Sequence, residues 1–149
     1  MKRNNIREKI RFREFTRDDF PEIQKLWEIT GMGSPERSDT ADTILNCNKL
    51  GGYFIVMYLP EKNKIIGTSW MTWDGRRTYI HHFGIHPDYQ GLGLGKILGW
   101  ESLKYIRKIG SQVKLEVHKK NDIAKNLYQK LGFFAFTDYD IYMIRKLEI

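Results

Sequence analysis

A glycine-rich stretch, Gln90-Gly91-Leu92-Gly93-Leu94-Gly95-Lys96, constrains the fold of this chain more than any other feature. The residues before it, 80–85, are β-branched and aromatic, which predicts a strand that ends at His86-Pro87. After it, apolar residues recur at three- and four-residue steps as far as Ile109, which predicts a helix. The glycines therefore join a strand to a helix.

Such a junction is suited to phosphate binding. Glycine tolerates positive φ and lets a ligand approach the backbone, while the first N–H groups of the helix lack helical partners and attract anions. The spacing is not that of a P-loop, because Ile97 follows Gly95-Lys96, and it is not G-x-G-x-x-G, because the glycines alternate. Judged alone, the loop could also be a glycine-rich turn without a ligand.

The composition is that of a globular protein. The 149 residues predict one domain, 1–149, and the chain is 41% hydrophobic and 29% charged. No apolar run approaches the ~18 residues of a membrane span. The basic residues at the N-terminus lead into charge rather than an apolar stretch, so we expect no secretory signal. The lone Cys47 excludes an internal disulfide, and we expect a cytoplasmic protein.

The net charge of +7 raises the question of nucleic acid binding. Lysine and arginine alternate with acidic residues along the chain and form no long basic block, which favours a solvated surface. A basic surface also attracts polyanionic small molecules. We therefore expect no nucleic acid partner.

The predicted elements follow the order β-α-α-β-β-β-α-β-α-β-β. Asp74-Gly75 marks a hairpin turn, so the three strands that follow the two early helices should form an antiparallel meander. A strand that follows a helix is expected to be parallel to the strand before that helix. The predicted strands are 6–15, 53–59, 64–73, 78–85, 113–117, 133–136 and 140–147, and the predicted helices are 16–31, 38–50, 94–109 and 121–131.

Two motifs, together with this order, resemble the GNAT superfamily of N-acetyltransferases. Gln90, Gly93 and Gly95 occupy the defining positions of its Q/R-x-x-G-x-G/A acetyl-CoA signature. Residues 121–133 are similar to its N-x-x-A-x-x-L-Y-x-K-x-G-F block, and the likeness covers residues 10–147. The resemblance implies an α/β (α+β) fold with a mixed, mostly antiparallel sheet of about seven strands flanked by four helices, strands 4 and 5 being parallel and splayed.

The resemblance also implies acetyl-CoA as cosubstrate. The main chain of the fourth strand would bind the pantetheine arm, and the glycine loop would wrap the pyrophosphate. The cofactor-binding residues implied are Phe83, Gly84, Ile85, Gln90, Gly91, Leu92, Gly93, Leu94, Gly95, Lys96, Asn121, Tyr128 and Lys130.

Tyr128 occupies the position of the family's usual general acid, which protonates the departing CoA thiolate. A core tyrosine beside Leu127 and Leu131 is the alternative. Asn121 is expected to cap the last helix as well as to contact the cofactor.

Two kinds of residue are candidates for the general base. Glu116, predicted on the fifth strand, is similar in its Leu-Glu-Val context to ribosomal-protein alanine acetyltransferases, in which that glutamate is proposed as base. His81, His82 and His86 cluster near the cofactor strand, and imidazole suits proton collection. Of these histidines we select His82. Neighbours on a strand point to opposite faces, so we expect no metal site.

The implied function is transfer of an acetyl group to a primary amine, of a small molecule or a protein, by direct attack in a ternary complex. The alternative is a catalytically silent CoA-binding sensor or interaction module. Residues 27–37 and 70–73 are expected to line the acceptor pocket, unless their aromatic residues belong to the core. Cys47 lies far from the motifs and is not expected to be a nucleophile. We expect a monomer or homodimer and no membrane partner.

Overall fold

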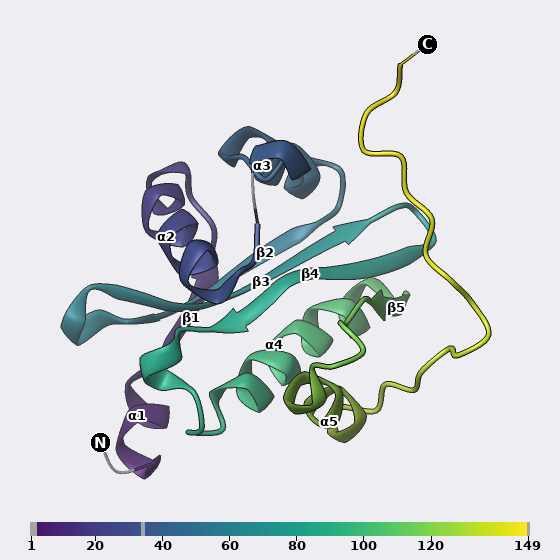
Figure 1. Cartoon of the computed structure of the whole chain (residues 1–149). Helices are drawn as coiled ribbons and strands as arrows, with labels where there is room; N and C mark the ends of the chain where they lie inside the picture. Colours follow the sequence, from purple (N-terminus) through teal and green to yellow (C-terminus); the bar gives the residue numbers. More distant parts are fainter. Residues whose placement is uncertain (1–2, 34, 149) are drawn as a thin grey trace. The chain divides into compact units, whose positions relative to one another are not determined.

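The computed structural model describes residues 3–33 and 35–148 (Figure 1). By its internal contacts the chain divides into two compact units, Met1–Glu116 and Val117–Ile149. We call them the first and the second unit and describe each by itself. The single domain over residues 1–149 stays a prediction.

The first unit contains a five-stranded sheet with the order β1-β2-β3-β4-β5. Neighbouring strands from β1 to β4 pair antiparallel, and β5 pairs parallel to β4. The predicted meander and the predicted parallel pair are thus confirmed. The strands are β1 (Arg11–Glu14), β2 (Tyr53–Leu59), β3 (Lys64–Trp73), β4 (Arg77–Ile85) and β5 (Gln112–Leu115).

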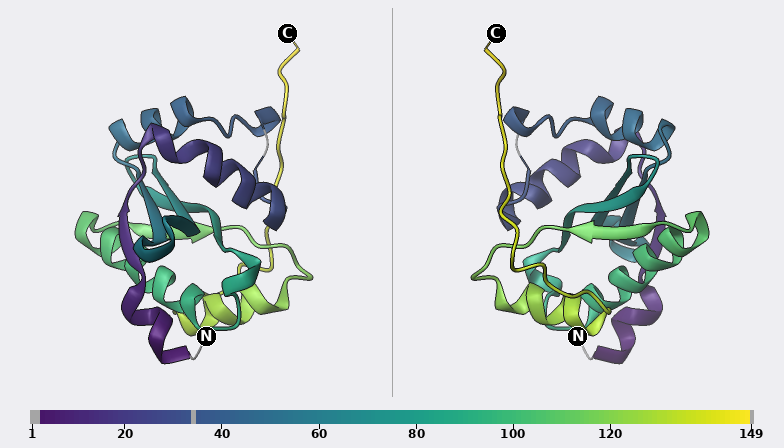
Figure 2. Two further views of the ribbon diagram at one scale, coloured as in Figure 1. Left: turned by 90° about the vertical axis from the view of Figure 1, so that its left-hand side faces the viewer. Right: turned by 90° about the vertical axis from the view of Figure 1, so that its right-hand side faces the viewer.

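Helices cover both faces of this sheet. In Figures 1 and 2, α2 (Phe20–Thr30) and α3 (Ala41–Lys49) lie on one face and α4 (Leu94–Ile109) lies on the other. The apolar stripe of α2 closes a core with β2 and β3, and Gly31, at φ 71°, ends the helix in the left-handed conformation. The core residues on this face are Phe15, Ile23, Leu26, Trp27, Ile44, Phe54, Val56, Ile65 and Trp70.

The first predicted strand, 6–15, is wrong over its first half. Residues Arg3–Lys9 form the helix α1, and only Arg11–Glu14 form a strand. The apolar residues Ile6 and Ile10 are 0% and 6% exposed and lie four positions apart, so that one side of a helical turn buries both. The bond from Ile10 N to Ile6 O, 3.1 Å, closes that turn.

The second unit contains α5 (Asp122–Lys130), which begins as predicted. The Asn121 side chain accepts a hydrogen bond from Ala124 N at 3.1 Å, so the predicted helix cap is confirmed. Gly132, at φ 99°, follows the helix.

The closing strands predicted over 133–136 and 140–147 are wrong, since residues 132–148 form no strand. The described part of the chain therefore has five strands and five α-helices rather than about seven strands and four helices. Alternation of apolar residues favours a strand, but a strand exists only when a neighbour supplies its ladder hydrogen bonds. The apolar side chains of this segment are exposed instead: Phe134, Phe136, Tyr139, Ile141, Tyr142, Met143, Ile144 and Leu147.

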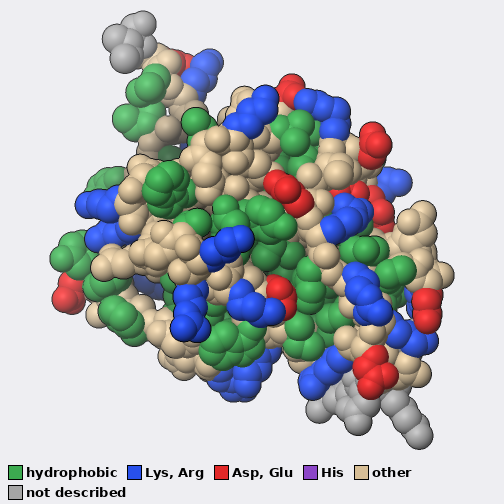
Figure 3. Space-filling model, turned by 180° about the vertical axis from the view of Figure 1, so that it is seen from behind, with side chains coloured by type: hydrophobic (Ala, Val, Ile, Leu, Met, Phe, Trp, Pro, Cys, Tyr) green, Lys and Arg blue, Asp and Glu red, His purple; other side chains and the backbone are tan. Residues whose placement is uncertain are grey.

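The surface is charged but mixed. On the face seen in Figure 3, lysine and arginine side chains are interspersed with acidic and apolar ones. Within the described residues, no helix has the length and apolar character needed to cross a membrane.

Candidate functional site

The site is organised around a bulge in β4. Thr68 of β3 pairs with Gly84, and Trp70 pairs with His81, so that the two residues between Gly84 and His81 oppose the single residue between Thr68 and Trp70. One of those two residues, His82, has φ 45°, an uncommon left-handed conformation for a residue with a side chain. Such strained positions cluster at functional sites, and the bulge re-aims the His82 side chain.

Hydrogen bonds from both faces of the sheet hold this bulge. Trp27 Nε1 of α2 donates to Thr68 Oγ1 at 3.1 Å, and Thr68 Oγ1 donates to the carbonyl oxygen of His82 at 2.8 Å. On the other face, Ser102 Oγ of α4 donates to Ser69 Oγ at 2.7 Å. Thr68, Ser69 and Ser102 are fully buried, so these bonds are shielded from water. The Thr68 bond holds the backbone of His82, and the Ser102 bond holds Ser69, the residue opposite the bulge.

The imidazole of His82 lies among aromatic rings and faces a carboxylate. Its centroid is 4.4 Å from that of Trp27 and 5.4 Å from that of Trp70. Its Nε2 is 3.1 Å from Oδ2 of Asp39, and the two side chains are only 14% and 5% exposed. Burial lowers the pKa of His82 and outweighs the opposing effect of Asp39. The ring is therefore neutral at pH 7 and able to accept a proton.

Three polar atoms, two of the His82 ring and one of the neighbouring Trp70, make no aligned hydrogen bond within the described residues. They are Nδ1 and Nε2 of His82 and Nε1 of Trp70, and all three are buried. Nε2 lies against the Asp39 carboxylate, whose charge and hydrogen bonding act on the ring, so Nδ1 is the ring nitrogen without a described polar partner. Buried polar groups almost always have partners, so this cluster has spare hydrogen-bonding capacity for a bound molecule.

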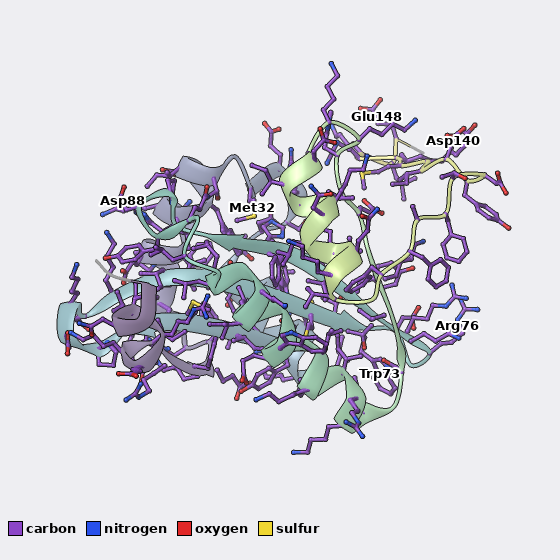
Figure 4. All side chains as sticks on the ribbon, turned by 90° about the horizontal axis from the view of Figure 1, so that it is seen from below. Met32, Trp73, Arg76, Asp88, Asp140 and Glu148 are labelled. Atoms are coloured by element: carbon purple, nitrogen blue, oxygen red, sulfur yellow. The ribbon has the colours of Figure 1, made fainter. Side chains whose placement is uncertain are left out.

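Just before the bulge, β5 ends and β4 continues without it. Their ladder ends at the pair Ile80–Leu115, while β4 continues to Ile85. The residues predicted to bind the pantetheine arm, 83–85, lie in this extension. A Cβ added at Gly84 would lie 2.5 Å from Cε of Met32, which Figure 4 labels, so a larger residue there would require the Met32 side chain to move.

The glycine loop has the predicted form of a strand-to-helix junction. Gln90 Nε2 donates to the carbonyl of Ile85 at 2.9 Å and ties the loop to the end of β4. Gly91 and Gly93 have φ 75° and 78°, as their residue type allows. Ile97 N bonds to Gly93 O at 3.4 Å, so the N–H groups of residues 94–96 precede the first helical bond. Such a junction fits a diphosphate.

Sequence reasoning missed Arg7. Its guanidinium donates from Nη2 to the carbonyl of Leu92 at 3.2 Å, and a Cβ added at Gly93 would collide with the same Nη2. Arg7 belongs to α1, where a strand was predicted, and the helical spacing of Ile6 and Ile10 was the signal that could have revealed it. A hollow of about 340 Å³ adjoins the loop and is lined by Lys62, Asp88, Tyr89, Gln90 and Leu92.

The residues predicted to line the acceptor pocket divide between core and surface. Trp27 and Trp70 stack with their ring centroids 6.2 Å apart and belong to the core. Met32 lies over Gly84, and Trp73, at the end of β3 and 39% exposed, packs against Gly51 (Figure 4). Cys47 of α3 is half-buried, and burial raises its pKa, which makes its thiol a poor nucleophile.

The three clustered histidines have different surroundings. His81 Nε2 lies 2.8 Å from Thr72 Oγ1, and burial lowers the pKa of His81. His86 Nδ1 accepts a hydrogen bond from Asp88 N at 3.1 Å. Over the part of the chain that the structure describes, no three or more His, Cys, Asp and Glu side chains are arranged to hold a metal ion.

Of the other predicted catalytic residues, Glu116 is the last residue of the first unit and Tyr128 belongs to the second. Glu116 is not on β5 as predicted, since the strand ends at Leu115 where its ladder with β4 ends, and Glu116 is exposed. Tyr128 of α5 is partly exposed, and burial raises its pKa to about 12. Asn121 and Lys130 are exposed at the two ends of α5.

Comparison with known proteins identifies the family of this chain. The sequence model of the acetyltransferase (GNAT) family matches residues 11–133, from β1 to the residue after Gly132. The chain belongs to the GNAT family. Its cosubstrate is therefore acetyl-CoA. The N–H groups of residues 94–96, which precede the first helical bond of α4, suit the diphosphate of that molecule. The helix α1, with Arg7, lies outside the matched region.

Solved structures share the GNAT fold at low identity. The ribosomal-protein-S18-alanine N-acetyltransferase from Escherichia coli is 19% identical with a TM-score of 0.72, over 86% of this chain and 79% of that chain. The PaiA N-acetyltransferase from Thermoplasma acidophilum, in complex with coenzyme A, is 20% identical with a TM-score of 0.71, over 88% and 92%. An acetyltransferase from Streptococcus agalactiae is 17% identical with a TM-score of 0.75, over 92% of each chain.

Proposed function

We propose that this protein is an N-acetyltransferase that transfers the acetyl group of acetyl-CoA to a primary amine by direct attack in a ternary complex. The observation that carries the proposal is the neutral imidazole of His82, buried on a strained bulge in the part of β4 that extends past the end of β5. In this proposal His82 is the general base and Tyr128 the general acid. The exposed Glu116 is the weaker candidate for the base.

The reaction needs a neutral amine. An α-amino group, with a pKa of ~8, is about one-tenth neutral at pH 7, whereas a lysine side chain, with a pKa of ~10.4, is less than one-thousandth neutral. The amine nitrogen forms a bond to the thioester carbonyl carbon, the C–S bond breaks, and a proton passes from nitrogen to His82, directly or through a water. Tyr128 gives its phenolic proton to the departing sulfur. Small-molecule and protein amines are both compatible with this scheme.

The cosubstrate is held by the main chain of residues 83–85 and by the loop from Gln90 to Lys96. Asn121 and Lys130 complete the proposed cofactor residues in the second unit. We add Arg7, because its guanidinium already lies on the loop carbonyl of Leu92 and has further N–H donors for a phosphate oxygen. We further propose a cytoplasmic monomer or homodimer without a nucleic acid partner.

Replacement of Arg7 by alanine tests its part in this site. A hydrogen bond to a charged group contributes about 1.5–3 kcal/mol, so we expect Arg7→Ala to weaken acetyl-CoA binding about tenfold or more. Titration calorimetry measures the change, and Arg7→Lys, which keeps the charge, should lose less. Arg17→Ala removes an exposed arginine paired with Asp42 and is the matched control. Equal affinity of Arg7→Ala and wild type would exclude this role.

Turnover of acetyl-CoA with a panel of amines tests the proposed function. Free thiol should be released in the presence of an accepted amine and only slowly without one. A silent CoA-binding module would bind acetyl-CoA in calorimetry and release no additional thiol with any amine. Binding to DNA or RNA at physiological salt would instead support the nucleic acid alternative.

A further inference from the structure

We propose that Asp39 is a positioning residue for His82: its carboxylate orients the imidazole and holds the proton on Nε2, which leaves the lone pair of Nδ1 to receive the proton of the acceptor amine. The inference rests on the proposed function for its chemistry. It rests on the structure for its geometry, because Asp39 lies in the segment between α2 and α3 and His82 lies on β4, 43 positions away (82 minus 39). No local sequence pattern brings these two side chains together.

The residues packed around His82 determine which edge of its imidazole faces Asp39. Nε2 faces Asp39, and the neighbouring Cδ2 lies 3.3 Å from the place of a Cβ on Gly33, so this edge of the ring is turned to the segment after α2. Trp27 and Trp70 pack on the ring at 4.4 and 5.4 Å between centroids. Nδ1, on the opposite edge, is buried and makes no aligned hydrogen bond to a described residue. It is therefore the nitrogen left for the reaction.

The charge of Asp39 also serves the proton transfer. A buried imidazole resists becoming an imidazolium, and a carboxylate beside it stabilises that cation. The other titratable and charged groups acting on His82 and its neighbour are Arg37, which lowers the pKa of His82, and His81, which is itself subject to both His82 and Asp39. Asp39 is thus the group in this set whose charge strengthens His82 as a base.

A purely structural role for Asp39 makes different predictions. In that case Asp39 would only tie the segment before α3 to the sheet, and its loss would lower the melting temperature without altering the titration of His82. In our proposal the neutral variant Asp39→Asn, which keeps the shape of the side chain, changes the titration of His82 and the kinetics together. The test therefore combines a spectroscopic readout with a pH profile.

The experiment uses the full chain labelled with ¹⁵N at histidine. In wild type, the ring nitrogens of His82 should show the Nε2–H tautomer. In Asp39→Asn, His82 should titrate at lower pH, and the acid limb of kcat should move to lower pH in the same direction. We expect kcat to fall about tenfold, less than the ~100-fold or more that complete loss of a general base costs, with KM for acetyl-CoA unchanged. Asp39→Glu, which keeps the charge, should retain more of the wild-type titration.

The matched control is Asp19→Asn, because Asp19 is the other buried carboxylate among the described residues and pairs with Arg13 at 2.7 Å. It should lower the melting temperature and leave the His82 titration and the pH profile unchanged. An unchanged titration and tautomer of His82 in both Asp39 variants would overturn the proposal. Because the spectra need no turnover, absence of acetyl transfer in wild type would refute the proposed function separately, while the Asp39–His82 coupling would still be measured.

Discussion

Gly93→Val will abolish acetyl-CoA binding. Gly93 has φ 78°, a conformation that β-branched residues rarely adopt, and a Cβ there would collide with the Arg7 guanidinium. The valine would also fill the face of the loop where the backbone must approach a diphosphate. We expect no measurable heat in calorimetry and no rise in melting temperature with excess acetyl-CoA, whereas wild type shows both.

A second glycine of the same helix separates backbone strain from loss of the site. Gly110, at φ 70°, caps the other end of α4, and a Cβ there meets no atom within 4 Å. Gly110→Val should therefore lower the melting temperature through the same backbone strain and keep its affinity for acetyl-CoA. Wild-type affinity in Gly93→Val would show that the loop from Gln90 to Lys96 does not hold the cosubstrate.

Tyr128→Phe will lower turnover about 100-fold, the lower end of the range for loss of a general acid, and leave the Kd for acetyl-CoA nearly unchanged. Burial raises the pKa of Tyr128 to about 12, so its phenol keeps its proton at neutral pH and can give it to the leaving sulfur. Phenylalanine preserves the ring packing against Phe133, whose centroid is 5.8 Å away, and removes only the phenolic hydroxyl that carries the proton. Steady-state kinetics and calorimetry measure the two effects.

The raised pKa of Tyr128 also predicts a pH dependence of stability. An unfolded tyrosine ionises near pH 10, before the folded one, so the unfolded state binds fewer protons and stability falls as pH rises from about 10 toward 12. Tyr128→Phe should lose this component of the alkaline decline. Tyr139→Phe removes a tyrosine that is 77% exposed in the same unit and is the control. Full activity of Tyr128→Phe at every pH would show that another group is the acid.

Most of the fold could be predicted from local sequence patterns. The strands Tyr53–Leu59 and Lys64–Trp73 have the predicted bounds, because apolar runs and the turns between them are read over a few residues. The glycine loop, the start of α4 and the Asn121 cap follow from φ preference and helix-end chemistry in the same way. The family, and with it acetyl-CoA, came from two such local motifs.

The tertiary structure decided what depends on partners distant in the chain. The contact of Asp39 with His82, the position of Arg7 on Leu92 and the bulge that gives His82 its φ of 45° all join separate elements, and no local spacing encodes them. The end of β5 at Leu115 and the absence of strands over 132–148 have the same origin. A local sequence pattern indicates which structure a segment favours. Hydrogen bonds and burial between elements determine which structure forms and which side chains meet.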